Sequence, residues 1–441
     1  MFTVLAAVFP WIPEGIAVPF LAAFVAAELL RVRALPMMVG CAYLLVSVVL
    51  LALGTQGVWP SFLSLWTAIR KTLPLLVLFG AVLWLQKSLA QDRAFGGLGN
   101  VLARLRPGTR TLAMSLGGHF IGGLLNMAGL QLVLSLRGSS TEAGLARAMT
   151  LPTARGFSAA GCWSPFMIGM AAALTALSTR WGEVAAVGLF IGLSLVALTW
   201  LWSFASTTQS PLAAVSESDT PPLAPPLFVV LAAIVLVGTP VLLLHELASL
   251  AMPVAIGLTA PIVALLWYRV RTGRRSYALR SELYFEVPYL RNEMFVLLSA
   301  NLFAVALLGH APQILGWLEA QAGVALDAAA TPAILVLVGT MLAAVGIHPI
   351  AFITFIGGTF PATPVEASRA LVALALAVVW GLGTMVSPIS AVNMIIARSL
   401  GESTFRIAWL YNGAFVAAAA CLAAAILVLV SGFPGFSGEG T

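Results

Sequence analysis

The sequence predicts an all-α polytopic membrane protein made of two inverted repeats, and three observations support this fold class. Of the 441 residues, 61% are hydrophobic and only 9% are charged. The pair Ser164-Pro165 recurs as Ser387-Pro388, an offset of 387 − 164 = 223 residues. A histidine within apolar sequence, His119, recurs as His348, an offset of 348 − 119 = 229 residues. Polar breaks at matching places in two apolar halves are typical of an internal duplication in a membrane protein.

The composition excludes a soluble enzyme. Soluble domains carry roughly 25% charged residues, whereas this chain has a mean hydropathy of +1.03, so lipid is the solvent of most of its surface. The net charge of +6 does not predict nucleic-acid binding, because the basic residues lie at the ends of apolar stretches. The three cysteines show no metal or redox spacing, and we expect small buried residues there. No basic segment precedes the first apolar run, so no cleaved signal peptide is expected.

Apolar stretches long enough to span a bilayer occur in both halves of the chain. In the first half they lie at about 15–30, 38–54, 73–90, 155–178 and 183–204. In the second half they lie at about 227–245, 250–268, 292–309, 368–397 and 406–431. Two further runs, 111–136 and 331–358, are interrupted by Gly, His or Pro and are interpreted as re-entrant hairpins.

Basic residues predict the orientation of the chain. They cluster after alternate spans, which the positive-inside rule assigns to the cytoplasmic side. The residues concerned are Arg31, Arg33, Lys87, Arg93, Arg104, Arg106, Arg110, Arg137, Arg147, Arg269, Arg271, Arg274, Arg275, Arg280, Arg291, Arg398 and Arg406. Both termini then lie outside, and the first spans of the two halves run in opposite directions. The first repeat covers 1–204, a cytoplasmic linker rich in Ser, Thr and Pro covers 205–226, and the second repeat covers 227–441.

Two amphipathic stretches occupy matching positions before the hairpins. They lie at about 93–106 and 312–325 and could rest flat at the membrane interface as connecting arms. An amphipathic pattern alone specifies only a half-buried helix, so ordinary loop helices are the alternative.

The Ser-Pro pairs are the first candidate site. Proline removes a backbone donor, so each segment should break into two half-helices, whose amide ends attract anions and whose freed carbonyls can hold a cation. A structural proline kink is the alternative, but two breaks at equivalent positions favour a binding site. The candidate residues at the breaks are Ser164, Pro165, Thr384, Ser387, Pro388, Ser390 and Asn393.

The hairpin tips are the second candidate site. Gly117–Gly123 surrounds His119 and is followed by Asn126, and His348-Pro349 follows Gly346. A histidine inside a membrane protein could donate to an anion or titrate near neutral pH. The alternative is a neutral histidine bonded to a carbonyl. We expect the tips and the breaks to surround one cavity.

Several functions of membrane proteins are disfavoured because the residues that they require do not appear in the sequence. Apart from Glu28, no carboxylate is expected deep in the membrane, which disfavours a cation antiporter built on buried aspartates. No Walker motif and no HExxH pattern appear, so no ATP-driven pump, no enzyme and no cofactor are expected. The one possible metal is a coupling Na⁺ held by backbone carbonyls near Ser164 and Ser387.

On these residues the chain resembles the ion transporter superfamily, which includes divalent anion/sodium symporters and the membrane subunits of tripartite periplasmic transporters. The symporters carry a Thr-Pro-Pro-Asn-like break in each half, to which Ser387-Pro388-Ile389-Ser390 is similar and Ser164-Pro165-Phe166-Met167 is a weaker match. Their hairpin tips carry Ser-Asn-Thr, whereas the tips here are rich in Gly and His.

The resemblance implies a scaffold and a mobile transport domain that slides as an elevator. The scaffold would comprise the spans within 15–90 and 227–309, joined by the arms. The transport domain would comprise the hairpins 111–136 and 331–358 and the broken helices 155–178 and 368–397, followed by closing spans 183–204 and 406–431. A homodimer in membrane lipid is the usual assembly.

The expected function is secondary active transport of a small, anionic organic solute, driven by Na⁺ or H⁺, in a bacterial inner membrane. Carbonyl sites at broken helices suit Na⁺, whereas histidine, with an ordinary pKa of about 6.5, suits H⁺. A channel-like or exporter subunit that needs a partner protein is the main alternative, and a membrane enzyme acting on lipid is a third class.

Overall fold

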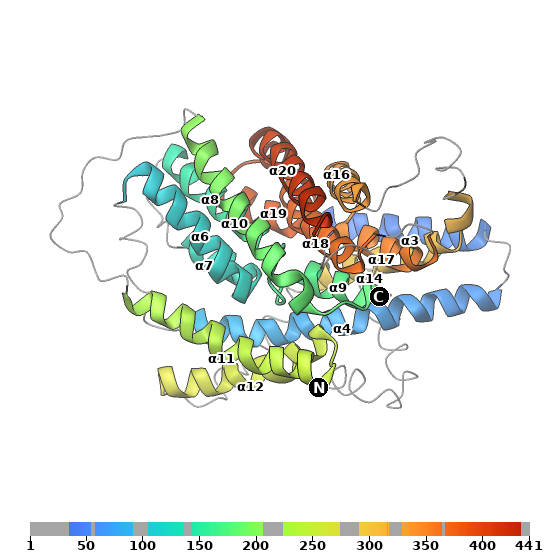
Figure 1. Ribbon diagram of the computed structural model, residues 1–441, viewed down its shortest axis with the longest axis horizontal. Helices are drawn as coiled ribbons and strands as arrows, with labels where there is room; N and C mark the ends of the chain where they lie inside the picture. Colours follow the sequence, from blue (N-terminus) through green and yellow to red (C-terminus); the bar gives the residue numbers. More distant parts are fainter. Residues whose placement is uncertain are drawn as a thin grey trace.

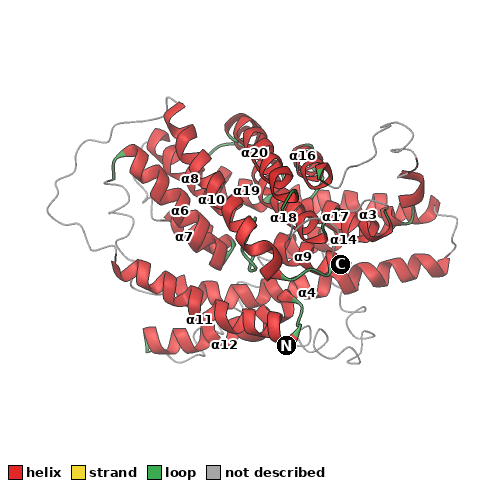
Figure 2. Cartoon of the chain, viewed as in Figure 1, coloured by secondary structure: helices red, strands yellow, loops and turns green. Residues whose placement is uncertain are grey.

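Helix is the regular secondary structure throughout the part of the chain that the structure describes (Figure 2). The structure, a computed structural model, describes residues 35–53, 58–90, 105–135, 143–205, 224–273, 291–314, 316, 329–363 and 367–433. The expected all-α class is confirmed. The first span at 15–30, with Glu28, and the arm at 93–106 lie almost wholly outside the described residues, as do most of the linker 205–226 and of the arm 312–325.

From α6 and from α16 onward, the described helices follow one another in a similar order. The first half contains α3 (Leu35–Leu53), α4 (Val58–Ala90), α6 (Pro107–Leu125), α7 (Met127–Ser135), α8 (Ala143–Ala160), α9 (Ile168–Leu177) and α10 (Trp181–Ala205). The second contains α11 (Ala224–Ala248), α12 (Met252–Thr272), α14 (Arg291–Leu308), α16 (Ala330–Ala344), α17 (Pro349–Thr359), η4 (Phe360–Ala362), α18 (Arg369–Val386), α19 (Ala391–Leu400), η5 (Arg406–Tyr411) and α20 (Gly413–Ser431). Helix α18 repeats α8 at an offset of 369 − 143 = 386 − 160 = 226, and α19 repeats α9 at 391 − 168 = 400 − 177 = 223.

Five stretches are long and apolar enough to cross a membrane, judged by length and composition over the described residues. They are Trp66–Leu89, Trp181–Phe204, Met252–Arg271, Arg369–Leu400 and Gly413–Ser431. Large apolar side chains stand exposed on several of these helices, including Phe190 on α10, Ile262 on α12 and Leu429 on α20. Such surfaces suit contact with lipid rather than with water.

Helix α18 lies at the centre of the molecule (Figure 1). It packs against α8, α9, α16 and α20, and its residues from Ala370 to Val379 are all buried. Helices α4, α11 and α12 lie along one edge of the molecule, where α4 packs against α12 and α12 against α11. Helix α14 packs against α3 and α17. The two broken helices are thereby surrounded by protein.

Helices α6 and α8 run parallel and in very close contact. A side chain at Gly156 would clash with the backbone of Ser115, and one at Gly118 would clash with the backbone of Thr153. Further along, Gly123 lies against Ala160. Small residues let helix backbones approach in a membrane, where packing rather than hydrophobicity drives association. The glycine-rich segment therefore serves helix packing.

Three element boundaries differ from the sequence expectations. The first broken helix begins at Ala143 rather than near 155, because Pro152 is accommodated inside α8. Helix α4 begins at Val58, well before the expected start at 73. The first hairpin turns at Asn126, which has a positive φ of 54°, rather than within Gly117–Gly123. Asparagine tolerates that backbone conformation better than most residues.

Candidate functional site

The two broken helices cross each other just before their breaks. The hydroxyl oxygens of Ser158 and Thr384 lie 3.5 Å apart. A side chain on Gly161 would lie 3.1 Å from the α-carbon of Gly381, so the backbones are nearly in contact. Ser158 precedes Ser164 by six residues and Thr384 precedes Ser387 by three. Both Ser-Pro pairs therefore follow the point where the helices cross within a few residues.

The second break is held open by its own polar side chains. Helix α18 ends at Val386, just before Ser387, and the Ser390 hydroxyl caps α19 by accepting from the backbone amide of Asn393 at 3.1 Å. Ser390 Oγ in turn donates to the carbonyl of Thr384 at 2.5 Å. The Asn393 amide group donates to the carbonyls of Met385 and Ser387, each at 2.8 Å. Carbonyls released by Pro388 are therefore satisfied from the following half-helix.

Two buried oxygen atoms at this break have no hydrogen-bond partner among the described residues. They are Ser387 Oγ and Asn393 Oδ1, on residues that are 2% and 0% exposed. A buried polar atom without a partner costs about 1–3 kcal/mol, so two unpaired oxygens at one helix break call for an explanation. An amide oxygen and a hydroxyl oxygen are ligands that a hard cation accepts.

The first break, in contrast, uses its polar side chains fully. Ser164 Oγ donates to the carbonyl of Gly123 at 2.5 Å and accepts from the amide of Phe166 at 3.3 Å. The Asn126 amide donates to the carbonyl of Phe166 at 3.2 Å. The turn of the first hairpin is thus fastened to the loop that follows Pro165, and both parts are buried.

His119 is not at a hairpin tip; it lies inside α6 and contacts α8. Trp163 Nε1 donates to His119 Nε2 at 2.9 Å, so the other ring nitrogen, Nδ1, carries the proton and faces the carbonyl of Gly156 at 3.2 Å. Trp181 Nε1 then donates to the carbonyl of Trp163 at 2.7 Å. Both nitrogens of a fully buried ring are occupied by protein, so His119 is a neutral histidine that fixes Trp163.

His348 lies at the tip of the second hairpin, as expected. Its Nδ1 accepts from the amide of Ile350 at 3.2 Å and caps α17, and Pro349 occupies the first helical position. The hydroxyl of Tyr43 on α3 accepts from the His348 amide at 2.5 Å. Nε2 has no hydrogen bond to a described residue, and the ring packs edge-on against Trp380, with 5.7 Å between ring centroids.

Sequence reasoning missed a polar chain that links the hairpin to α14 and α4. Thr354 donates to Asn301 Oδ1 at 2.5 Å, and Asn301 Nδ2 donates to Thr72 at 3.0 Å. All three residues are buried. An asparagine inside an apolar helix is costly unless paired, so Asn301 is the signal that could have identified the chain.

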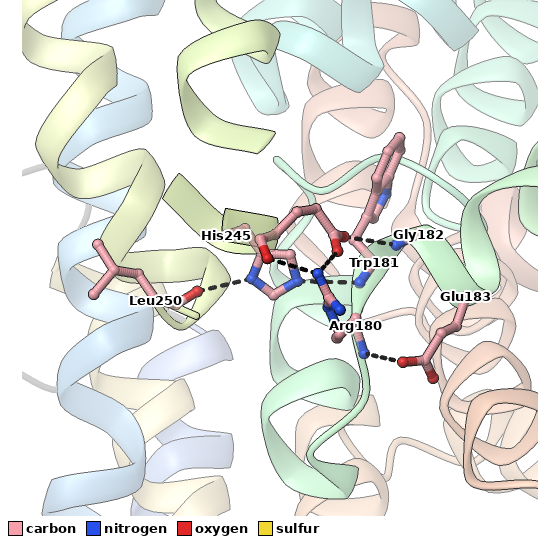
Figure 3. A network of polar contacts seen from close by, with 7 residues as sticks. Arg180, Trp181, Gly182, Glu183, His245 and Leu250 are labelled. Carbon is pink, nitrogen blue, oxygen red and sulfur yellow. Dashed lines mark hydrogen bonds and ion pairs between the residues drawn. The ribbon is translucent and has the colours of Figure 1, made fainter. Parts of the chain in front are cut away.

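A second polar network joins the start of α10 to the α11–α12 connection (Figure 3). Arg180 pairs with the carboxylate of Glu246 at 2.5 Å, and Glu246 accepts from the amide of Gly182 at 3.0 Å. His245 Nε2 accepts from the amide of Trp181 at 3.1 Å, so its Nδ1 donates to the carbonyl of Leu250 at 2.8 Å. Because Trp181 also holds Trp163, this network connects the first break to α11.

The described residues contain no group of three His, Cys, Asp or Glu side chains that could hold a metal ion. Within them, the candidate residues other than His119 fall into two sets. Ser164, Pro165 and Asn126 lie at the first break. Thr384, Ser387, Pro388, Ser390 and Asn393 lie at the second, with His348 and Pro349 at the adjoining hairpin tip.

No protein-family model and no curated protein sequence matches this chain. Among solved structures, the crystal structure of the Alcanivorax borkumensis YdaH transporter, described as having an unusual topology, is similar with a TM-score of 0.56. The two sequences are 15% identical, and the match covers 91% of this chain and 99% of that chain. At that identity the likeness shows the fold. The expected multi-span membrane architecture is confirmed, while the subfamily stays a prediction. The chain is a multi-pass integral membrane protein with a fold like that of the YdaH transporter.

Proposed function

We propose that the chain is a secondary active transporter that moves a small, anionic organic solute across the membrane. The observation that carries this proposal is the crossing of two Ser-Pro-broken helices in the buried centre. The Ser158–Thr384 and Gly161–Gly381 contacts bring the breaks of both halves to one place. Discontinuous helices that meet near the centre of duplicated halves are the arrangement secondary transporters use for substrate. The likeness of the fold to a transporter supports the same proposal.

The matching helix order supports an inverted repeat with an elevator mechanism. The hairpins α6–α7 and α16–α17 and the broken helices α8–α9 and α18–α19 would form the transport domain. Helices α3, α4, α11, α12 and α14 would belong to the scaffold, which would pair two copies of the chain in membrane lipid. The distribution of basic residues would place both termini outside in a bacterial inner membrane.

The preference for an anion follows from the helix ends at the site. Helices α17 and α19 both begin there, at His348 and Ser390. The amide end of a helix carries a partial positive charge and free donors. Among the described residues, the polar side chains at the breaks are Ser, Thr, Asn and His, so no carboxylate there would repel an anion.

Sodium coupling is proposed at the second break. Ser387 Oγ and Asn393 Oδ1 are the unpaired oxygens. The carbonyls of Met385 and Ser387 lie close to them, because both carbonyls accept hydrogen bonds from Nδ2 of the same Asn393. A bound Na⁺ would satisfy both oxygens. Proton coupling is the alternative, and it would use His348, whose Nε2 is unpaired among described residues, rather than His119, whose ring is fully engaged.

Transport by the purified chain tests the proposal. Thermal unfolding against small carboxylates, sulfonates and phosphate esters, in sodium or choline buffer, identifies a ligand, since a ligand stabilises the folded state that binds it. Uptake of that ligand into liposomes is then measured under a Na⁺ gradient at constant pH, and under a pH gradient without Na⁺. Accumulation above the external concentration is expected under the Na⁺ gradient.

Two serine variants locate the ion. Ser387→Ala removes a proposed ligand and should weaken the apparent Na⁺ affinity roughly tenfold or more. Ser164→Ala is the matched control. The Ser164 hydroxyl is already bonded to the carbonyl of Gly123, so its removal should leave the Na⁺ dependence of uptake unchanged. Equilibration without accumulation would indicate a channel-like protein, and no movement at all would indicate a subunit that needs a partner. Uptake driven by pH alone and lost in His348→Ala would refute sodium coupling.

A further inference from the structure

A second cluster of polar groups lies away from the helix breaks, around a pocket of about 300 Å³. The pocket is bounded by the first turn of α6, the first half of α8, the last turns of α10, and η5. Three arginines line it: Arg110 from α6, and Arg147 and Arg155 from α8. None of these was predicted as a site residue: Arg110 and Arg147 were interpreted as orienting charges, and Arg155 was not singled out.

Arg155 is buried and held in place by protein. It is 7% exposed, its Nε donates to Asn412 Oδ1 at 3.1 Å, and its Nη2 donates to the carbonyl of Tyr411 at 2.8 Å. Its guanidinium lies over the ring of Phe415, 4.2 Å from the centroid. All of these partners are neutral. A guanidinium stays protonated in proteins, so a full positive charge is buried here without an anionic partner among the described residues.

Arg110 is buried more deeply than Arg155, and its side chain is less well hydrogen-bonded. It is 2% exposed and lines the pocket, but its side chain has no hydrogen bond or ion pair to a described residue. A buried charge is ordinarily paired, because leaving it unpaired costs several kcal/mol. Two buried arginines, neither with an anionic partner among the described residues, therefore face one pocket, and an anion in it would stabilise both charges.

The charge count around the pocket points the same way. The one carboxylate near it among described residues is Glu402, which already pairs with Arg147 at 3.4 Å and with Arg406 at 3.5 Å. Among the described residues, the three lining arginines and Arg406 stand against one glutamate, which leaves 4 − 1 = +3. Helices α6 and α8 run parallel and both begin here, so their positive dipole ends add to the field.

We infer that this pocket binds the carboxylate or phosphate group of an anionic ligand between Arg110 and Arg155. Both groups match the planar fork of a guanidinium. The ligand is either a free anion or the headgroup of an anionic lipid, since basic pockets between helices on the cytoplasmic side suit headgroups. The inference does not rest on the proposed transport, because binding here needs no movement of the broken helices.

Direct binding to the full-length protein tests the inference. The purified chain is placed in nanodiscs of phosphatidylcholine alone, and binding of inorganic phosphate and of acetate is measured by calorimetry. In a second arm, native mass spectrometry measures retention of phosphatidylglycerol offered at low mole fraction. We expect saturable binding in at least one arm. Binding in the first arm identifies a free anion as the ligand, and retention in the second identifies a lipid.

Variants connect the binding to the pocket. Arg110→Gln should weaken the observed binding roughly ten- to a hundredfold, as expected for loss of a charge-assisted hydrogen bond, and it should fold because no described group depends on Arg110. Arg110→Lys should retain part of the affinity. Arg180→Gln, at the opposite end of α10, is the matched control and should bind as the native protein does. The inference is overturned if neither arm shows binding, or if Arg110→Gln binds as tightly as Arg180→Gln.

Discussion

Replacing Gly156 by alanine should separate α6 from α8 and release His119. The added carbon would lie 2.7 Å from the carbonyl carbon and 2.9 Å from the α-carbon of Ser115, and closer still to its carbonyl oxygen. Ordinary contacts begin near 3.4 Å, so the helices must part by at least about 3.4 − 2.7 = 0.7 Å. The His119–Gly156 contact of 3.2 Å would lengthen toward roughly 3.9 Å, beyond hydrogen-bond distance.

The magnitude follows from three contributions. Overpacking of this kind costs about 1–3 kcal/mol, and loss of one buried hydrogen bond costs about 1 kcal/mol. The gain in helix propensity from glycine to alanine offsets about 1 kcal/mol. Gly156→Ala should therefore destabilise the protein by about 1–3 kcal/mol.

Thermal unfolding in detergent, followed by tryptophan fluorescence or by size-exclusion chromatography, measures the effect. Gly80→Ala in α4 is the matched control, because nothing lies within 4 Å of the added carbon, and it should be neutral or slightly stabilising. If Gly156→Ala unfolds at the same temperature as Gly80→Ala, the close contact between α6 and α8 is wrong.

Three further predictions use other parts of the site. Trp163→Phe removes the hydrogen-bond donor to His119 and should destabilise the protein by about 1 kcal/mol. Trp409→Phe, which removes a donor on an exposed residue, should have a smaller effect. Equal melting temperatures of the two variants would contradict the role of the His119 bond. His245→Ala should detach the amide of Trp181 and increase hydrogen exchange at the start of α10 more than at its end; uniform exchange would argue against the network. In a cysteine-free background, Arg406→Cys should react with an impermeant thiol reagent from the cytoplasm and Arg180→Cys from outside, and the reverse pattern would invert the topology.

The sequence was most informative where proline dictates backbone geometry. Both Ser-Pro pairs lie at real interruptions, Ile168 and Ala391 begin the second half-helices, and Pro349 begins α17 after the capping His348. Proline acts through its own missing donor and fixed φ, although Pro152 inside α8 and Pro74 inside α4 show that a proline by itself does not end a helix.

Glycine misled the prediction for the opposite reason. A glycine-rich stretch permits a turn or a close helix contact, and only the partner helix decides which. The stretch around His119 became a packing face for α8, while the turn moved to Asn126. The pocket arginines could not be found either, because Arg110 and Arg155 come together through the pairing of α6 with α8, which the order of residues does not reveal.

The buried position of α18 has a consequence for biosynthesis. The helix is apolar enough to leave the translocation machinery, yet its break at Ser387 would expose polar backbone to lipid if it stood alone. Helices α8 and α9, which are synthesised more than two hundred residues earlier, pack against α18, as do α16 and α20. The first half can therefore be in place as a docking surface before the second break arrives. A chain truncated after 205 should assemble its own helices, whereas a chain beginning at 224 should be recognised by membrane quality control and degraded.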